Sequence, residues 1–151
     1  MFGNKIDPLI NVSSDSHTIN RAPDRKMNYP ANGPEILIID DESDICFLLS
    51  AILKQKELAS VFASSLTEAS EIMKCTKEFS FIFLDNHLPD GRGVDYIKQI
   101  KESFPSCKVI MITAHDNQTD REKASNEGAD YFIGKPFTRE LILNTIKDLS
   151  A

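Results

Sequence analysis

The chain has 151 residues, of which 41% are hydrophobic and 26% are charged, and its formal net charge is −6 at pH 7. This length suits one domain with a tail. No apolar stretch reaches the roughly 18 residues that a membrane-spanning helix needs. The negative charge disfavours nucleic-acid binding, because a phosphate backbone attracts Lys and Arg. We therefore expect neither a membrane nor a nucleic acid among its partners.

The three cysteines, Cys46, Cys75 and Cys107, lie far apart and form no paired motif. This pattern argues against a disulfide framework or a zinc site. No secretory signal is visible, so we expect a reducing, cytoplasmic location. We interpret Cys46 and Cys107 as small core or surface residues rather than redox sensors.

Residues 1–33 differ in composition from the rest of the chain. They are rich in Asn, Ser, Asp and Pro and show no sustained apolar period. Such a segment cannot bury enough surface to offset its ordering entropy. We expect a flexible N-terminal extension over 1–33 and a folded domain over 34–151.

The first predicted element is the continuous apolar run over 36–39, which is typical of a strand buried on both faces of a parallel sheet. Apolar residues then recur at helical spacing, and Ser43 or Asp44 can cap the helix that they predict. These apolar residues are Ile45, Leu48, Leu49, Ile52 and Leu53.

The same alternation of strand and helix continues to the end of the chain. Gly128 is well placed to end the fourth helix. The alternation predicts an α/β fold, (βα) five times, with helices on both faces of a parallel sheet. The further strands are predicted over 60–63, 79–84, 108–112 and 131–133, and the further helices over 66–77, 94–101, 117–127 and 141–149.

Polar residues follow the predicted strands at one end. Asp40 and Asp41 follow the first strand, Asp85 the third, Thr113 the fourth and Lys135 the fifth. Because ligands of open α/β sheets bind beyond the carboxyl ends of the strands, we expect these side chains to converge on one edge.

Three converging carboxylates would repel one another unless a cation joined them. Oxygen ligands select a hard cation such as Mg²⁺, which binds carboxylates together with phosphate oxygens. An aspartate can act as a nucleophile toward a phosphoryl group, and a lysine supplies a point charge for phosphate oxygen. No nucleotide-binding glycine motif occurs, so the predicted chemistry is phosphoryl transfer from a donor that brings its own phosphate.

From about Glu35 to Leu149 the chain resembles a receiver domain of the two-component response-regulator family. All five signature positions are filled, in order, at the family's spacing. The resemblance implies a flavodoxin-like, doubly wound five-stranded sheet with strand order 2-1-3-4-5. The matching segments are IIDDE (38–42), DNHLPDGRG (85–93), ITA (112–114) and GADYFIGKPF (128–137).

The resemblance also implies roles for individual residues. Asp85 would accept a phosphoryl group from a phosphohistidine of a sensor histidine kinase or a histidine phosphotransfer protein. Mg²⁺ would be bound by Asp85, by Asp41 directly, by Asp40 through water and by the backbone carbonyl of His87. Lys135 would pair with a phosphoryl oxygen.

The remaining roles concern signalling. The Lys135–Pro136 bond would be cis. Thr113 would move toward the phosphoryl group while Phe132 turns inward. These movements would change how the surface formed by the fourth helix, fifth strand and fifth helix binds an unknown downstream protein. The chain would act as a stand-alone domain, monomeric or weakly dimeric, that catalyses only its own phosphorylation and dephosphorylation.

His87 and His115 each lie two residues beyond a signature residue, and we hypothesise that one imidazole modulates hydrolysis of the acyl phosphate. The alternatives are two solvent-facing loop histidines or a transition-metal pair. The alternative for Phe132 is a buried, immobile core ring. For the whole chain, the alternatives are a receiver-like scaffold that is not phosphorylated and a small Mg²⁺-dependent phosphohydrolase using Asp85. Arg92 departs from the family, many of whose members carry Asp or Ser there.

Overall fold

The computed structural model describes residues 35–150, which belong to the second of the chain's two compact units, 34–151. The flexible extension expected over 1–33 lies outside the described residues. Five parallel strands form one sheet in the order β3-β2-β4-β7-β8, which is order 2-1-3-4-5 along the chain and confirms the expected fold. The strands are β2 (Ile36–Ile39), β3 (Ser60–Ala63), β4 (Phe81–Asp85), β7 (Lys108–Thr113) and β8 (Tyr131–Gly134).

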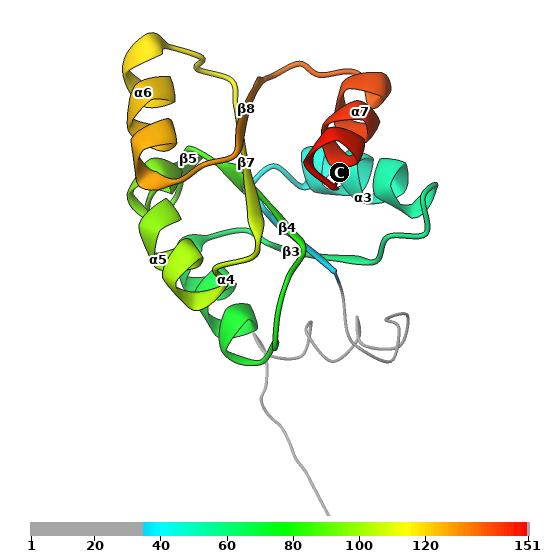
Figure 1. The fold of residues 1–151 in the computed structure, drawn as a ribbon, viewed down its shortest axis with the longest axis horizontal. Coiled ribbons are helices and arrows are strands. Elements are labelled where there is room, and N and C mark those ends of the chain that lie inside the picture. Colours follow the sequence, from blue (N-terminus) through cyan, green and yellow to red (C-terminus); the bar gives the residue numbers. More distant parts are fainter. Residues whose placement is uncertain (1–34, 151) are drawn as a thin grey trace, which may run out of the picture. The chain divides into compact units, whose positions relative to one another are not determined.

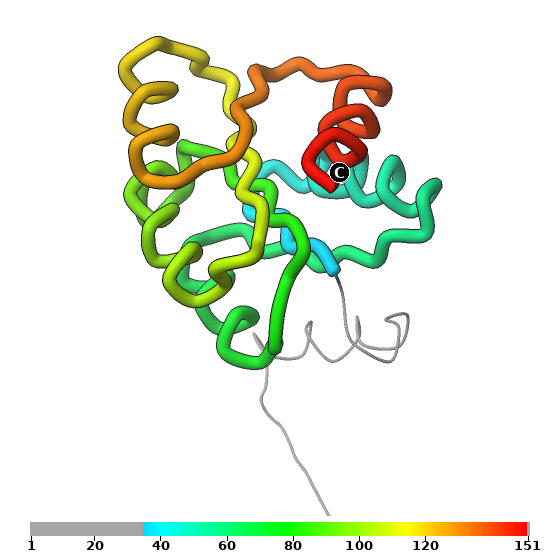
Figure 2. The backbone as a smooth tube through the Cα atoms, viewed as in Figure 1, coloured from blue at the N-terminus to red at the C-terminus, as the bar shows by residue number. Residues whose placement is uncertain are grey.

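The helices cover both faces of this sheet, with α3 and α7 on one side and α4, α5 and α6 on the other (Figure 1). The backbone tube shows the same two layers (Figure 2). No helix within 35–150 is long and apolar enough to cross a membrane. The helices are α3 (Ser43–Lys54), α4 (Leu66–Lys74), α5 (Ile97–Ser103), α6 (Gln118–Glu127) and α7 (Arg139–Ser150).

The interior strand β2, which lies between β3 and β4, shows why this segment is a continuous apolar run. All four of its residues are fully buried. Side chains of a strand alternate between its two faces, and Ile36 and Ile38 pack in one cluster with Leu49 of α3 and Ile142 of α7. The layer of α4, α5 and α6 covers the other face, so both faces of β2 need apolar residues.

The buried face of α3 differs from the prediction. Leu48 is 46% exposed, whereas Cys46 is buried beside Leu49 and Leu53. At 100° per residue the buried stripe is centred between Leu49 and Leu53, and Leu48 lies about 110° from that centre. Phe47 is 61% exposed, and its ring makes an edge-to-face contact with Phe62 of β3, with the ring centroids 5.7 Å apart. Phe47 and Leu48 therefore form an exposed apolar pair on α3.

Several element boundaries also differ. The helix predicted over 66–77 ends at Lys74, and a 3-10 helix (Gly93–Asp95) precedes α5. Glu42, rather than Ser43 or Asp44, occupies the N-cap position of α3, without a side-chain capping bond. Gly128 ends α6 in the left-handed conformation, with φ 111°, as expected. The strand predicted over 79–84 begins at Phe81, and β4, β7 and β8 each end one residue later than predicted, at Asp85, Thr113 and Gly134. The edge that carries the site is unchanged.

Candidate functional site

The parallel register brings the first two acidic positions together. Ile39, the last residue of β2, pairs with Leu84 of β4. Asp40 directly follows β2, and Asp85 is the last residue of β4, so the two lie at the same level of the sheet. Asp41 lies next along the chain. The carboxyl edge of the sheet therefore gathers three acids from two neighbouring strands, as the sequence predicted.

Asp40, Asp41 and Asp85 offer ligand oxygens that all lie within 4.8 Å of one another. Asp40 and Asp85 are buried, whereas Asp41 is exposed. A triad of carboxylate oxygens, two of them withdrawn from water, suits a hard divalent cation. The donor set therefore fits a receiver-type metal site, with Asp41 on its open side.

The ionisation of Asp85 reflects this crowding. Burial, followed by the charge of Asp40, raises the pKa of Asp85 to about 6. Burial likewise raises the pKa of Asp40, although a hydrogen bond from Lys135 works against the shift. Two buried carboxylates side by side disfavour each other's ionised form. A cation bound among them would relieve that repulsion.

Lys135 reaches this cluster from the end of β8. Its Nζ lies 2.9 Å from Asp40 Oδ2, 2.7 Å from Glu42 Oε1 and 3.7 Å from Asp85 Oδ1. Burial opposes its positive charge, but hydrogen bonds to Glu42 and Asp40 and the charge of Asp85 leave the pKa of Lys135 above its ordinary value. The Lys135–Pro136 peptide bond is cis. The ammonium is thus held charged beside the predicted phosphoryl acceptor.

Thr113 is the last residue of β7, and its side chain is completely buried. Its hydroxyl oxygen accepts a hydrogen bond of 3.1 Å from the backbone N–H of His115. Its carbonyl accepts one of 2.8 Å from the backbone N–H of Lys135. β7 pairs with both β4 and β8, so Thr113 lies between the strand that ends at Asp85 and the strand that leads to Lys135.

The two predicted modulator histidines meet in space. The ring centroids of His87 and His115 lie 4.7 Å apart with an interplanar angle of 66°, an edge-to-face contact. Both residues are exposed. Because His87 follows Asp85 and His115 follows Thr113, this ring pair stands at the solvent side of the same edge.

Phe132, the predicted coupled aromatic, is half-buried on β8. The Arg121 guanidinium carbon lies 4.7 Å from the centroid of its ring, a geometry that favours a cation–π attraction. Arg121 also makes hydrogen bonds of 2.6 and 2.9 Å to Asp116. The ring is therefore covered by a side chain of α6, and any rotation of the ring would disturb that contact.

A polar network behind Asp85 was not anticipated from the sequence. The fully buried Asn86 donates to Asp120 Oδ2 at 3.0 Å, and its own oxygen accepts from the backbone N–H of Val94 at 3.1 Å. Arg92 makes a 2.6 Å ion pair with Asp120. Burial opposes the charge of Asp120, but hydrogen bonds from Asn117 and Arg92 hold its pKa below the usual value. Arg92, the departure from the family pattern, thus joins the loop after Asp85 to α6.

Gly93 explains another feature of the same loop. A Cβ at this position would collide with the backbone carbonyl of Asp85 and crowd Leu84. Its N–H donates to the carbonyl of Asn86 at 2.9 Å. The loop therefore folds directly over the strand end that carries Asp85, and only glycine fits.

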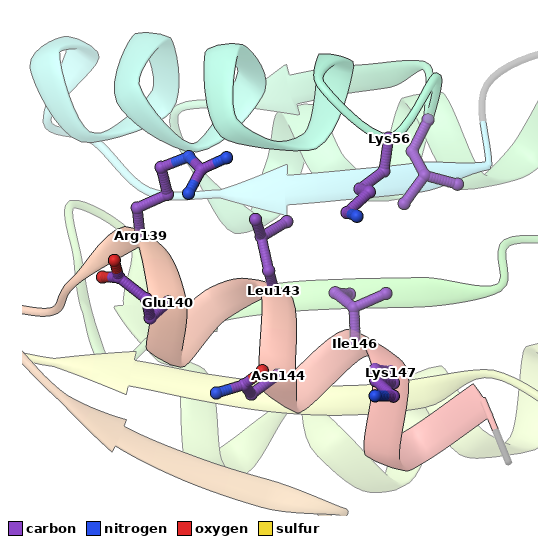
Figure 3. Close-up of a pocket in the computed structure, with 8 residues that line it drawn as sticks. Lys56, Arg139, Glu140, Leu143, Asn144, Ile146 and Lys147 are labelled. Carbon is purple, nitrogen blue, oxygen red and sulfur yellow. The ribbon is translucent and has the colours of Figure 1, made fainter.

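A separate groove of about 590 Å³ lies between the end of α3 and α7 (Figure 3). Leu58, Leu143 and Ile146 provide apolar lining, and Lys56 and Arg139 are among the charged residues around it. None of the sequence-predicted site residues lines this groove. The acidic edge and the α3–α7 groove are therefore distinct features of the domain.

The fold and the acidic edge together define a class of protein: a doubly wound α/β domain with carboxylates, a hydroxyl and a lysine at the carboxyl ends of its strands. The model of the response regulator receiver domain family matches residues 36–147. The chain belongs to this family. Residues 36–147 therefore form a phosphoacceptor signalling module of two-component systems, and receiver domains partner histidine kinases.

Known proteins agree with this assignment. The response regulator protein PilR of Pseudomonas aeruginosa is 34% identical over 115 residues, covering 74% of this chain and 26% of PilR. A CheY-like receiver domain from Methanospirillum hungatei has a TM-score of 0.73 and 27% identity, over 78% of this chain and 94% of that one. A response regulator from Burkholderia pseudomallei, solved with a phosphorylated aspartic acid and a calcium ion, has a TM-score of 0.69 and 25% identity, over 78% of this chain and 73% of that one.

This chain spans 26–50% of the length of the first curated relatives that it matches. The similarity therefore concerns their receiver portion.

Proposed function

We propose that this domain accepts a phosphoryl group on Asp85 from a phosphohistidine and thereby changes which partner it binds. One observation carries the proposal: the Lys135 ammonium lies 3.7 Å from the Asp85 carboxylate, and Asp85 belongs to a cluster of three aspartates whose ligand oxygens all lie within 4.8 Å of one another. A nucleophilic oxygen, a cation site and a charged donor are the parts that phosphoryl transfer needs.

In the proposed transfer, a carboxylate oxygen of Asp85 attacks the phosphorus of the phosphohistidine. The new O–P bond forms as the N–P bond breaks, and the imidazole nitrogen leaves with the bonding electrons and takes up a proton. Lys135 would pair with an oxygen of the phosphoryl group. Thr113, whose hydroxyl oxygen accepts from a backbone N–H, retains its own proton for donation to the same group.

We propose Mg²⁺ as the cation, held by Asp41 directly, by Asp40 through water, by Asp85 and by the carbonyl of His87. When bound, Mg²⁺ would neutralise charge on the transferring phosphoryl group. The raised pKa of Asp85, about 6, favours cation binding, because at neutral pH the carboxylate is ionised while its negative charge is incompletely balanced by nearby positive charge. The chain's own contribution is to hold three oxygen ligands together on two rigid strand ends.

The return step is hydrolysis, in which a water oxygen attacks the phosphorus, the O–P bond to Asp85 breaks and inorganic phosphate leaves. His87 and His115 each lie two residues beyond a site residue, and their exposed rings touch each other. We propose that the pair sets the lifetime of the acyl phosphate by positioning or excluding water. Replacing each histidine by Ala and timing phosphate loss tests this; unchanged lifetimes would refute it.

For the output, we propose that the surface of α6, β8 and α7 changes on phosphorylation. Phosphorylation adds roughly −1.5 to −2 charges, which would draw Thr113 and Lys135 toward Asp85. Phe132 would then leave its place beneath Arg121 and turn inward. Tyr131, 45% exposed on the same strand, would report the altered surface to a downstream protein.

The test is uptake of phosphate from acetyl phosphate, measured by intact-protein mass spectrometry with and without Mg²⁺. The wild-type chain should gain one phosphate only when Mg²⁺ is present, and Asp85→Asn should gain none. Absence of uptake by the wild-type chain would favour the scaffold alternative. Repeated turnover of free phosphoesters would favour the phosphohydrolase alternative.

A further inference from the structure

One ammonium serves three carboxylates at this site, and they do not share it equally. Lys135 Nζ lies nearest to Glu42, at 2.7 Å, next to Asp40, at 2.9 Å, and farthest from Asp85, at 3.7 Å. Only the two shorter distances lie within ordinary hydrogen-bond range. In the unphosphorylated domain, the lysine is thus bonded to the acids that flank the acceptor.

Glu42 differs from the other two acids in its surroundings. It occupies the N-cap position of α3, and its side chain is 59% exposed, against 3% for Asp40 and 7% for Asp85. It is absent from the set of acids whose oxygens converge as a cation site within 35–150. Its bond to Lys135 joins positions 93 residues apart. Glu42 therefore contacts the site by its bond to Lys135 and is not one of the proposed cation ligands.

We propose that Glu42 is a positioning residue: it holds the Lys135 ammonium away from Asp85 and competes with the phosphoryl group for it. This inference rests on the proposed phosphoryl transfer to Asp85. With a cation on the triad, Asp40 and Asp85 attract the ammonium less, and Glu42 remains the competing anion. Bonding of Lys135 to a phosphoryl oxygen then requires weakening or loss of the Glu42 contact, so Glu42 lowers both the rate of phosphoryl uptake and the stability of the phosphorylated state.

The size of the effect follows from the exposure of Glu42. Pairs of this kind are worth about 0.2–1 kcal/mol because water screens them, which corresponds to about 1.4- to fivefold in an equilibrium constant. Neutralising Glu42 should therefore favour a phosphoryl-like ligand by a few-fold rather than by orders of magnitude.

The experiment compares Glu42→Gln with Asp44→Asn, using beryllofluoride in the presence of Mg²⁺ as the probe. Asp44 is an exposed acid two residues further along, in the first turn of α3, and it makes no ion pair with Lys135. Both variants remove one negative charge near an anionic ligand. The comparison therefore separates release of Lys135 from a general change in charge.

We expect Glu42→Gln to bind beryllofluoride about two- to fivefold more tightly than Asp44→Asn, and to take up phosphate from acetyl phosphate faster by a similar factor. Mg²⁺ affinity, measured alone, should be the same in the two variants, a result that a loss of local structure would not produce. Equal or weaker beryllofluoride binding by Glu42→Gln would overturn the inference. If the wild-type chain bound no beryllofluoride with Mg²⁺ present, the proposed function itself would fail.

Discussion

Lys135 and Asp85 come from the ends of two strands that are not neighbours in the sheet, yet their charged atoms lie 3.7 Å apart. β7 lies between β4 and β8, and the carbonyl of Thr113 at its end accepts a hydrogen bond of 2.8 Å from the backbone N–H of Lys135. The relationship places a permanent positive charge beside a carboxylate whose pKa is raised to about 6.

Replacing Asp85 by Asn should stabilise the fold in the absence of metal, by about 1–2 kcal/mol at pH 7. The substitution removes one of two adjoining buried carboxylates while leaving Lys135 its closer bonds to Asp40 and Glu42. Urea denaturation at pH 7 would measure it, with Asp148→Asn, an exposed aspartate on α7, as the control. A destabilised Asp85→Asn variant would contradict the account of the triad.

The difference in stability between Asp85→Asn and the wild-type domain should increase with pH over a defined range. The pKa of Asp85 is raised from 3.8 to about 6, so between these values the native state binds more protons than the unfolded state. The contribution of Asp85 to stability is therefore present in full below pH 4 and lost as the pH rises through about 6. The advantage of Asp85→Asn should vanish near pH 4, grow up to pH 6 and remain constant above it. A pH-independent difference would refute this.

Mg²⁺ should raise the melting temperature of the wild-type domain at pH 7.5, because a ligand that binds only the native state stabilises it. The effect should weaken below about pH 6, where the Asp85 carboxyl takes up a proton that competes with the cation. Asp41→Asn should lose most of the effect. NaCl at matched ionic strength is the control, and an equal rise in NaCl would show that the triad binds no specific cation.

Some features of the fold and of the site could be predicted from the sequence, and others could not. The three interior strands were the most predictable, because parallel strands buried on both faces need continuous apolar runs, as at 36–39 and 109–112. The position of the site was predictable because the topology brings every strand end to one edge. The buried faces of the helices were predicted less well. In α3, Cys46 is buried and Leu48 is exposed, because the buried stripe is centred between Leu49 and Leu53.

The polar partners could not be predicted. Glu42 stands within the segment that carries the family resemblance, but no spacing rule indicates that its carboxylate bonds to Lys135. The pairing of Arg92 with Asp120 likewise depends on the arrangement of a loop against α6. Such contacts join distant positions without periodicity, so only the three-dimensional structure identifies them.

The network behind Asp85 should contribute strongly to stability through its buried member. Asn86→Ala removes a hydrogen-bond partner from the Val94 N–H and from the Asp120 carboxylate. The free energy of unfolding, measured by urea denaturation, should therefore fall by about 2–3 kcal/mol. Lys123→Ala provides a matched control, because it removes an ion pair of α6 with Asp95 in which both side chains are about half exposed. That change should cost less than about 1 kcal/mol. Equal costs for the two variants would rule out a structural role for the network.

The exposed apolar pair on α3 should speed phosphoryl transfer from a protein donor but should not affect phosphoryl transfer from a small molecule. Phe47→Ala and Leu48→Ala remove exposed apolar surface from α3, the helix that follows Asp40 and Asp41 along the chain, and each should slow phosphoryl transfer from a cognate histidine kinase about tenfold. Uptake from acetyl phosphate should stay the same. Tyr131→Ala, which alters the edge strand β8 instead of α3, should affect neither reaction. Slower uptake from both donors would indicate damage to the site instead.

The central claim is that Asp85 carries the phosphoryl group, and reductive trapping tests it most directly. Borohydride converts an aspartyl phosphate to homoserine, which peptide mass spectrometry locates after reaction with acetyl phosphate and Mg²⁺. We expect homoserine at position 85 alone, and none when Mg²⁺ is omitted. Homoserine at Asp40 or Asp41, or at no position despite phosphate uptake, would contradict the assignment.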